Sequence, residues 1–441
     1  RLASAMQAPD RTAMVRGTLE ACALALERSG ASRNDPACAL TVPGRIEVLG
    51  KHTDYAGGRS ILAAPERGVT LVAVPRDDAR VRVHDVSSGE RVELALDPAM
   101  VPGSGWANYP ATAARRLARD FPGARTGAEI AFASDLPPAS GMSSSSAFLV
   151  AVFQALAAVN GVEETVRWRE NVATREDLAG YLSTVENGQA FGTLPGDLGV
   201  GTQGGSEDHT AMTCARPGSL VRYAFAPVRF ERELPVPAGH RFAIASSGVR
   251  AEKTGAARER YNRASELMRA AAALWREATG RDDHTVGAAL DSAPDAAGRL
   301  REVLAATRDA RYAPEELLGR VEQFIVEDRE VIPAASEALS RGDLAAFGAA
   351  VDRSQELAER LLGNQTPETA QLARRARELG AAAASAFGAG FGGSVWALVA
   401  DGEAGGFLAR WRADYLARFP GHEVDARFFT TRAGPPLARI I

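Results

Sequence analysis

The sequence predicts an α+β fold in which strands meander and helices lie between them. Two runs, 80–86 and 91–96, alternate apolar and polar residues with a period of two, as half-buried antiparallel strands do. Longer segments, of which 12–28 is the first, repeat apolar residues at helical spacing. Because the two kinds of segment interleave without the regular order of a βαβ repeat, a layered α+β sandwich is favoured.

The first half of the chain is expected to be rich in strands. The apolar run VTLVAV at 69–74 is typical of a buried strand, and AEIAFA at 128–133 has the same character. A serine-rich loop then leads into 147–159, an apolar segment long enough for a buried helix. In chain order we expect a helix at 12–28, strands at 46–49, 69–74, 80–86, 91–96 and 128–133, and a helix at 147–159.

The second half is expected to contain more helix. Polar and proline-rich residues break the pattern near 215–235, so we expect an N-terminal domain at 1–220 and a C-terminal domain at 221–441. The remaining segments show helical apolar spacing or short apolar runs. We expect strands at 220–225, 241–246 and 394–400, and helices at 255–277, 315–325, 343–362, 368–380 and 403–417.

Composition places the chain among ordinary globular proteins. Its 441 residues exceed one typical domain, and 46% are hydrophobic and 24% charged. A net charge of −4 argues against nucleic-acid binding, and no apolar run reaches the ~18 residues that span a bilayer. Three scattered cysteines, and no secretory signal after Arg1-Leu-Ala-Ser4, favour reduced thiols in the cytoplasm. We therefore expect neither a nucleic-acid nor a membrane partner.

A serine-rich loop carries the clearest chemical signal. It reads Leu136-Pro-Pro-Ala-Ser-Gly-Met-Ser-Ser-Ser-Ser-Ala147 and lies between an expected strand and an expected helix. Gly141 permits close backbone approach, and the N–H groups of a helix start attract anions. Serine hydroxyls there can also ligate Mg²⁺, a cation that prefers oxygen. A flexible linker or plain helix capping is the alternative interpretation.

A second glycine-rich stretch, Gly388-Ala-Gly-Phe-Gly-Gly-Ser-Val395, matches GxGxxG by letter. A dinucleotide-binding loop follows a strand and opens a helix, whereas this stretch leads into the strand expected at 394–400. The further motifs that protein kinases carry downstream of their glycine loop are absent from the sequence. By itself the stretch indicates a tight turn between helix and strand as well as any ligand loop.

A third stretch, Gly44-Arg-Ile-Glu-Val-Leu-Gly-Lys-His52, resembles a P-loop but has five residues between the glycines where four are required. A histidine also stands where a P-loop has Ser or Thr. The stretch is dense in polar side chains, which continue through Asp54 and Tyr55. It suits either an exposed charged loop or a pocket for a polyhydroxylated ligand.

In this order the three stretches resemble the GHMP small-molecule kinases, and specifically their galactokinase branch. Pro43 to Tyr55 resembles the sugar-binding signature of that branch, and 136–147 and 388–394 resemble the second and third family motifs. The segment 202–208 stands where the family carries its catalytic aspartate, and 247–262 is similar to a galactokinase segment with a sugar-contacting tyrosine. The resemblance spans about residues 42 to 400 and implies a two-lobed GHMP kinase fold with the active site between the lobes.

The resemblance also implies roles for individual residues. Asp208 would be the catalytic base that takes the proton of the sugar hydroxyl, and Arg45 beside it would keep that carboxylate ionised and offset phosphoryl charge. The cofactors implied are ATP and Mg²⁺, with Ser145 and Glu186 as metal ligands. The sugar would be bound by Glu47, Lys51, His52, Asp54, Gly205 and Tyr261. The nucleotide phosphates would be bound by Pro138, Gly141, Met142, Ser143, Ser144, Ser145 and Ser146.

The sequence departs from the branch mainly around the sugar. Lys51 replaces a glutamate that accepts a sugar hydroxyl, Glu47 stands where asparagine is typical, and Glu207-Asp-His209 replaces Met-Asp-Gln. Lys51 either pairs with Glu47, four residues away, or faces an anionic group such as the carboxylate of a uronic acid.

The function expected is that of an ATP-dependent sugar kinase, galactokinase-like and acting at the anomeric C1 hydroxyl. The alternatives are a kinase for an anionic or other substrate (a uronic acid, a heptose, arabinose or an isoprenoid alcohol) and a catalytically silent sugar- and nucleotide-binding paralogue. The partner expected is a small-molecule sugar, and the protein is expected to be a monomer or homodimer.

Overall fold

The computed structural model describes residues 9–32, 35–250, 255–309 and 311–441. The expectations about residues 1–4 and the portion 251–253 of the tyrosine-bearing segment therefore lie outside the described residues. The strands and helices expected from the pattern are present within three residues of their expected ends, except that the helix expected at 343–362 is α-helical only to Leu357 and ends in a π-helical turn, Ala358–Leu362. The mixed α+β class is confirmed. No helix among the described residues has both the length and the apolar character needed to cross a membrane.

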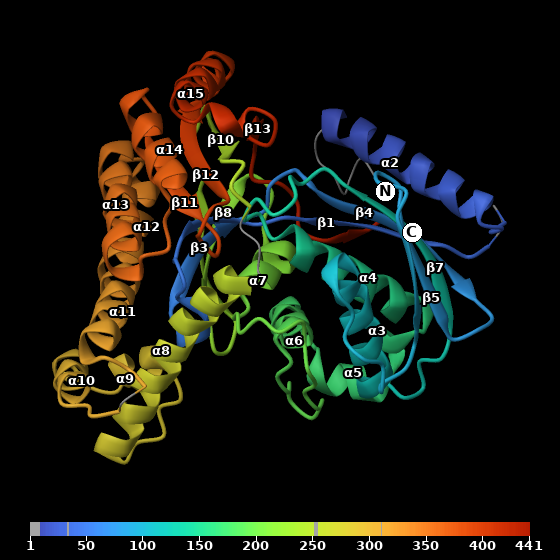
Figure 1. The fold of residues 1–441 in the computed structure, drawn as a ribbon, viewed down its shortest axis with the longest axis horizontal. Helices are drawn as coiled ribbons and strands as arrows, with labels where there is room; N and C mark the ends of the chain where they lie inside the picture. Colours follow the sequence, from blue (N-terminus) through green and yellow to red (C-terminus); the bar gives the residue numbers. More distant parts are fainter. Residues whose placement is uncertain (1–8, 33–34, 251–254, 310) are drawn as a thin grey trace.

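The largest sheet has six strands and is built almost wholly from the first half of the chain (Figure 1). Its neighbouring strands are antiparallel except β7 (Gly127–Ser134) and β5 (Arg80–Asp85), which run parallel. Helix α2 (Pro9–Arg28) packs on β4 (Gly68–Arg76) and β7. Helix α4 (Ser144–Val159) packs on β1 (Cys38–Pro43) and β4 from the other face. Its strands, in spatial order, are β14 (Ala438–Arg439), β1 (Cys38–Pro43), β4 (Gly68–Arg76), β7 (Gly127–Ser134), β5 (Arg80–Asp85) and β6 (Arg91–Ala95).

Two four-stranded sheets complete the β structure. One consists, in spatial order, of β2 (Ile46–Leu49), β3 (Arg59–Ala63), β8 (Ser219–Ala224) and β9 (Arg229–Pro235). The other consists of β11 (Ala383–Phe387), β12 (Ser394–Ala400), β10 (His240–Ser246) and β13 (Arg427–Thr431). Helices α14 (Pro367–Glu378) and α15 (Ala404–Arg418) pack on this last sheet.

Helices fill the rest of both halves. In the first half α3 (Asn108–Asp120) and α6 (Arg175–Asn187) pack beside α4, and the short α7 (Glu207–Cys214) packs on α6 and α4. None of these three was expected from the pattern. In the second half, besides α14 and α15, the described residues form α8 (Gly255–Thr279), α9 (Val286–Asp291), α10 (Ala296–Ala305), α11 (Pro314–Val326), α12 (Ile332–Arg341) and α13 (Leu344–Leu357). A π-helical turn, η4 (Glu327–Val331), joins α11 to α12.

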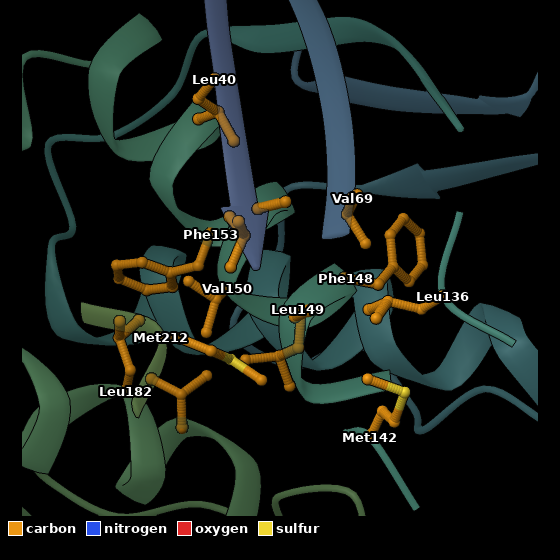
Figure 2. Close-up of a cluster of buried hydrophobic side chains, with 14 of the residues drawn as sticks. Leu40, Val69, Leu136, Met142, Phe148, Leu149, Val150, Phe153, Leu182 and Met212 are labelled. Atoms are coloured by element: carbon orange, nitrogen blue, oxygen red, sulfur yellow. The ribbon is translucent and has the colours of Figure 1, made fainter. Parts of the chain in front are cut away.

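One hydrophobic cluster runs through both halves and fixes their relative position. It includes Leu40 and Leu149 from the first half and Phe347 and Trp396 from the second. Figure 2 shows its part beneath β1 and β4, where the apolar face of α4 meets the sheet. Helix α4 is buried nearly all round, as its apolar sequence predicts. Burial of each of its leucine side chains therefore contributes about 1.5–3 kcal/mol to the free energy of folding.

The expected domain boundary between residues 220 and 221 falls inside β8. This strand pairs along its length with β3 of the first half, from Arg59↔Ala224 to Leu62↔Val221. The two-residue strand β14, near the end of the described chain, pairs back onto β1. The two halves therefore share sheets as well as a core.

Candidate active site

The part of the sugar-binding signature that follows β2, residues 50–55, is here called the sugar-signature loop, and its backbone is tightly turned. Gly50 has a positive φ of 110°, and a Cβ there would collide with Ser60 of β3. His52 also has a positive φ, 58°, which is rare for a residue with a side chain and is held only where the surroundings over-determine it. A single 3₁₀ turn, η1 (Asp54–Ala56), follows. The turn brings the His52, Asp54 and Tyr55 side chains to one pocket.

Arg45 connects two of the expected motifs directly. It precedes β2 and is 4% exposed. Its Nε donates to Asp208 Oδ1 at 2.7 Å, and its Nη1 donates to the carbonyl oxygen of Gly141 at 2.9 Å. Asp208 stands in the first turn of α7, where the helix dipole favours a carboxylate. One guanidinium therefore joins the proposed base to the serine-rich loop.

The pocket around this ion pair lies between the sugar-signature loop, α6, α7, α8 and the second glycine-rich stretch, 388–395. It contains about 520 Å³ of space not filled by atoms, with the open solvent at its mouth included. Of the residues expected at the site, it is lined by Arg45, Glu47, His52, Asp54, Glu186, Gly205, Asp208 and Tyr261. It is also lined by residues for which no role was expected, namely Tyr55, Ser183, Asn187, Thr202, Gly204, Glu207 and His209.

Two glycines make room for the polar side chains of the pocket. A Cβ on Gly205 would lie 2.6 Å from Asp54 Oδ2, and a Cβ on Gly204 would lie 2.8 Å from the Tyr261 hydroxyl oxygen. Asp54 is then held by backbone N–H groups, since Glu207 N donates to its Oδ2 at 3.1 Å and Tyr55 N donates to its Oδ1 at 2.8 Å. Gly205 thus has a steric reason for its place at the site.

Lys51 does not line the pocket. It is 1% exposed, and its ammonium donates to Ser385 Oγ at 2.7 Å and to Ser354 Oγ at 3.3 Å, both in the second half of the chain. The expectation that Lys51 contacts the sugar is therefore not supported by its position, and neither is its contact with an anionic group of the substrate. The alternative, a pair with Glu47, is supported only by electrostatics: the positive charge of Lys51 counteracts the upward pKa shift that burial imposes on Glu47, but the ammonium is bonded to the two serines and forms no direct ion pair with that carboxylate in the part of the chain that the structure describes.

The serine-rich loop has the backbone of an anion-binding turn. Ala139, Gly141 and Ser143 all have positive φ, at 50°, 75° and 58°, so the chain turns sharply before α4 starts at Ser144. No side chain caps that start, and its N–H groups remain available to an anion. Ser144 and Ser145 are partly exposed there.

Not every residue expected to bind phosphate presents its side chain. Met142 is fully buried in the hydrophobic cluster, as Figure 2 shows, so only its backbone belongs to the loop. Pro138 is exposed at the loop's outer edge. Ser146 is buried, and its hydroxyl oxygen has no hydrogen-bond partner among the described residues.

The second glycine-rich stretch, 388–395, packs against the serine-rich loop. A Cβ on Gly388 would lie 2.7 Å from the carbonyl oxygen of Gly141, and Ser394 Oγ donates to the carbonyl oxygen of Ser140 at 2.7 Å. Gly388 and Ala389 also line the pocket. Gly388 is therefore explained by close backbone contact between the two loops, whereas a Cβ on Gly390 would meet Asn364 and a Cβ on Gly392 would meet Val249.

The residues expected to bind Mg²⁺ fit it by their chemistry. Glu186 lines the pocket on α6, with its Oε2 3.2 Å from His209 Nε2, and Ser145 stands in the first turn of α4. Among the described residues no three His, Cys, Asp or Glu side chains gather as a metal cluster. Mg²⁺ is commonly held by one or two carboxylates together with substrate phosphates, and one carboxylate with a serine hydroxyl supplies that kind of oxygen set.

Glu207 is a site residue to which the sequence assigned no role. Its Oε2 accepts a hydrogen bond from Ser60 Oγ at 2.6 Å, and its Oε1 lies 3.5 Å from Arg45 Nε. Burial raises its pKa well above the ordinary range, the nearby Glu47 carboxylate raises it further, and Arg45 opposes the rise. The signal in the sequence that could have identified it is that Glu207 stands where the family carries methionine.

We expect Glu207→Gln to stabilise the protein at pH 7, by on the order of 1 kcal/mol. A carboxyl with a raised folded-state pKa stabilises the fold fully below its unfolded pKa of about 4.3 and loses that contribution as pH rises toward the folded-state pKa. Glutamine mimics the protonated form at every pH. Urea unfolding at pH 4 and pH 7 measures the difference, with the exposed Glu277→Gln of α8 as control. Equal destabilisation at both pH values would contradict this assignment.

Comparison with known proteins agrees with the motifs. Residues 108–197 match the GHMP kinases N terminal domain, and 335–416 match the GHMP kinases C terminal domain. Residues 28–75 match the galactokinase galactose-binding signature. The two domain matches lie on either side of the boundary expected near residue 220.

Curated relatives align over most of their length. Galactokinase from Chloroflexus aggregans is 29% identical over 405 residues, which cover 89% of this chain and 91% of the relative. Galactokinase from Streptomyces coelicolor is also 29% identical, over 83% of this chain and 85% of the relative.

Solved structures share the fold. Lactococcus lactis galactokinase complexed with galactose superposes with a TM-score of 0.75 at 22% identity, covering 95% of this chain and 98% of that one. A mevalonate kinase superposes with a TM-score of 0.54 at 16% identity, covering 90% of this chain and 99% of that one. With the domain matches and the galactose-binding signature in the order of its own motifs, the chain belongs to the GHMP kinase superfamily, in its galactokinase-like branch of sugar kinases.

Proposed function

We propose that the protein transfers the terminal phosphoryl group of ATP to the anomeric C1 hydroxyl of a galactose-type monosaccharide. The observation that carries the proposal is the bridge made by Arg45, which contacts both the Asp208 carboxylate and the Gly141 carbonyl. A base for the acceptor and a cradle for the donor are thereby held at opposite ends of one guanidinium. Phosphoryl transfer depends mainly on such positioning and on electrostatic stabilisation.

In the proposed reaction Asp208 accepts the proton of the sugar hydroxyl. The hydroxyl oxygen forms a bond to the terminal phosphorus of ATP, the bond from that phosphorus to its bridging oxygen breaks, and ADP leaves with the electron pair. Arg45 offsets the negative charge on the transferred group. His52, Asp54 and Tyr261, which line the pocket, would bind the other hydroxyls of the sugar.

The nucleotide would be held at the serine-rich loop. The N–H groups at the start of α4 and the hydroxyls of Ser143, Ser144 and Ser145 suit its phosphates. Mg²⁺, held by Glu186 and Ser145, would neutralise phosphate charge. Three buried thiols, Cys22, Cys38 and Cys214, support the proposal of a cytoplasmic enzyme, which we propose to be a monomer or homodimer.

A panel of acceptors tests the substrate. We expect galactose to give a kcat/KM at least about 10-fold above that of galacturonate. The carboxylate of galacturonate would enter a pocket already lined by acidic side chains, among them Glu47 and Asp54. ADP release would be measured for both sugars and for arabinose, a heptose and an isoprenoid alcohol, and phosphorus NMR would identify an anomeric phosphate. A preference for galacturonate would contradict the substrate class. No ADP release with any acceptor would favour the silent paralogue.

A further inference from the structure

Helix α11 and the π-helical turn η4 contact the sugar-signature loop through three side chains on one face. Arg320, Gln323 and Glu327 are spaced three and four residues apart, so they project from successive turns toward the same neighbour. They meet three consecutive residues of the loop. Arg320 donates to the carbonyl oxygen of His52, Gln323 donates to that of Lys51 at 3.3 Å, and Glu327 accepts from Gly50 N at 2.8 Å.

This contact explains how the loop keeps its unfavourable backbone. Gly50 and His52 both have positive φ, and the strain at His52 persists only if its surroundings hold it. Arg320 and Glu327 are both buried, at 2% and 0% exposed, so water does not compete for their hydrogen bonds. A π-helical turn is itself uncommon and is often found near functional sites.

Arg320 also reaches the side chains of the loop. Its Nη2 donates to the Tyr55 hydroxyl oxygen at 3.1 Å, and that oxygen lies 2.8 Å from His52 Nδ1. On its other side, His52 Nε2 lies 3.1 Å from the carbonyl oxygen of Ala389 in the second glycine-rich stretch. These contacts form one chain from the guanidinium to the stretch that packs on the serine-rich loop.

The direction of the protons in this chain follows from its two ends. A guanidinium can only donate and a carbonyl oxygen can only accept. His52 Nε2 therefore carries the proton that goes to Ala389, and Asn364 Nδ2 makes only a longer contact, 3.5 Å, with the same nitrogen. In this tautomer Nδ1 accepts, so Tyr55 accepts from Arg320 and donates its own proton to His52 Nδ1. Burial raises the pKa of Tyr55 to about 12, so the hydroxyl keeps the proton it donates.

We propose that Arg320 is a positioning residue for sugar binding, which acts through the Tyr55 hydroxyl to hold His52 in its Nε2–H tautomer and in one orientation. The proposal rests on the proposed function, in which His52 belongs to the sugar pocket. Positioning of this kind affects substrate binding more than phosphoryl transfer, because neither Arg320 nor Tyr55 touches the ion pair of Arg45 and Asp208 in the contacts described.

Kinetics of single and double variants tests the connection. We expect Arg320→Gln and Tyr55→Phe each to raise the KM for the sugar about 10-fold, with the KM for ATP within twofold and kcat changed less than KM. The double variant should be no worse than the poorer single variant, since both changes break one chain. Arg320→Lys should recover most of the loss, and Arg360→Gln, which removes an exposed arginine paired with Glu356, should behave as wild type. A KM for the sugar in the double variant that rises by the product of the two single-variant increases would overturn the proposal.

A second measurement does not depend on activity. In protein labelled with ¹⁵N-histidine, the ring signals of His52, assigned by their loss in His52→Asn, should show the Nε2–H tautomer in wild type. They should move toward tautomer averaging in Tyr55→Phe, which removes one hydroxyl and keeps the ring. Unchanged His52 signals in Tyr55→Phe would overturn the proposal. If the wild type phosphorylated no sugar, the proposed function would fail, whereas the tautomer measurement would still decide this inference.

Discussion

Asp208→Asn is expected to reduce turnover by about 10²–10⁴-fold while ATP still binds within a few-fold of wild type. Asparagine keeps the size of the side chain and one oxygen for the 2.7 Å contact with Arg45, so the pocket is preserved. The amide cannot accept the proton of the sugar hydroxyl. The acceptor oxygen is then a poorer nucleophile, and kcat falls without a matching change in nucleotide binding. ADP release under saturating galactose and calorimetric ATP binding measure the two quantities.

A matched control separates the loss of a base from the loss of any surface charge. Asp97 is exposed after β6, where its carboxylate accepts from Ala99 N, and Asp97→Asn makes the same chemical change away from the pocket. Its turnover should equal that of wild type. Near-normal turnover in Asp208→Asn would remove this carboxylate from the mechanism. Loss of ATP binding along with turnover would instead indicate that the variant disturbs the Arg45 bridge.

Lys51→Met should destabilise the fold by about 3–5 kcal/mol and leave the ratio of kcat/KM for galactose and galacturonate unchanged. Methionine has a similar length but no charge, and it leaves the hydroxyls of Ser354 and Ser385 without their buried donor. The Glu47 carboxylate also loses the positive charge that offsets its burial. Because the ammonium is turned away from the pocket, its loss has no direct effect on which sugar fits.

Ser385→Ala provides the comparison for Lys51→Met. It removes the acceptor of Lys51 at 2.7 Å and the donor to Gln355 Oε1 at 3.0 Å but keeps the ammonium, so it should cost about 1–3 kcal/mol, less than Lys51→Met. Urea unfolding measures both variants, and the sugar ratio is measured on the fraction that folds. A shift of the ratio toward galactose by 10-fold or more in Lys51→Met would return this lysine to the sugar pocket. Wild-type stability would contradict the buried network.

The strands and helices with strong apolar patterns were predictable because local spacing determines them. The six-residue run at 69–74 is one example, and it forms the centre of β4. Helices α6 and α7 were missed because their buried faces are short and mixed with polar residues that serve the pocket. Glu186 at the end of α6 and His209 in α7 are such residues, and they break the pattern from which a helix is inferred.

The three loops of the site were predictable from their order and residue types, but the direction of single side chains was not. Lys51 stands in the signature itself, yet its partners Ser354 and Ser385 are 303 and 334 residues away in the sequence. Nothing near Lys51 indicates that these hydroxyls will draw the ammonium into the core. Arg320 was missed for the same reason, since it lies on an ordinary amphipathic helix 268 residues after His52.

The pairing of β8 with β3 has a mechanical meaning for how reactants reach the site. Four residue pairs, from Arg59↔Ala224 to Leu62↔Val221, join a strand of the first half to a strand of the second half. Strand β14, near the end of the described chain, pairs with β1 of the first half. No hinge between residues 220 and 221 could swing the halves apart without breaking these ladders and opening the common core. In the proposed reaction the sugar and the nucleotide would therefore enter and leave past the loops that line the pocket, while the shared sheets beneath them stay closed.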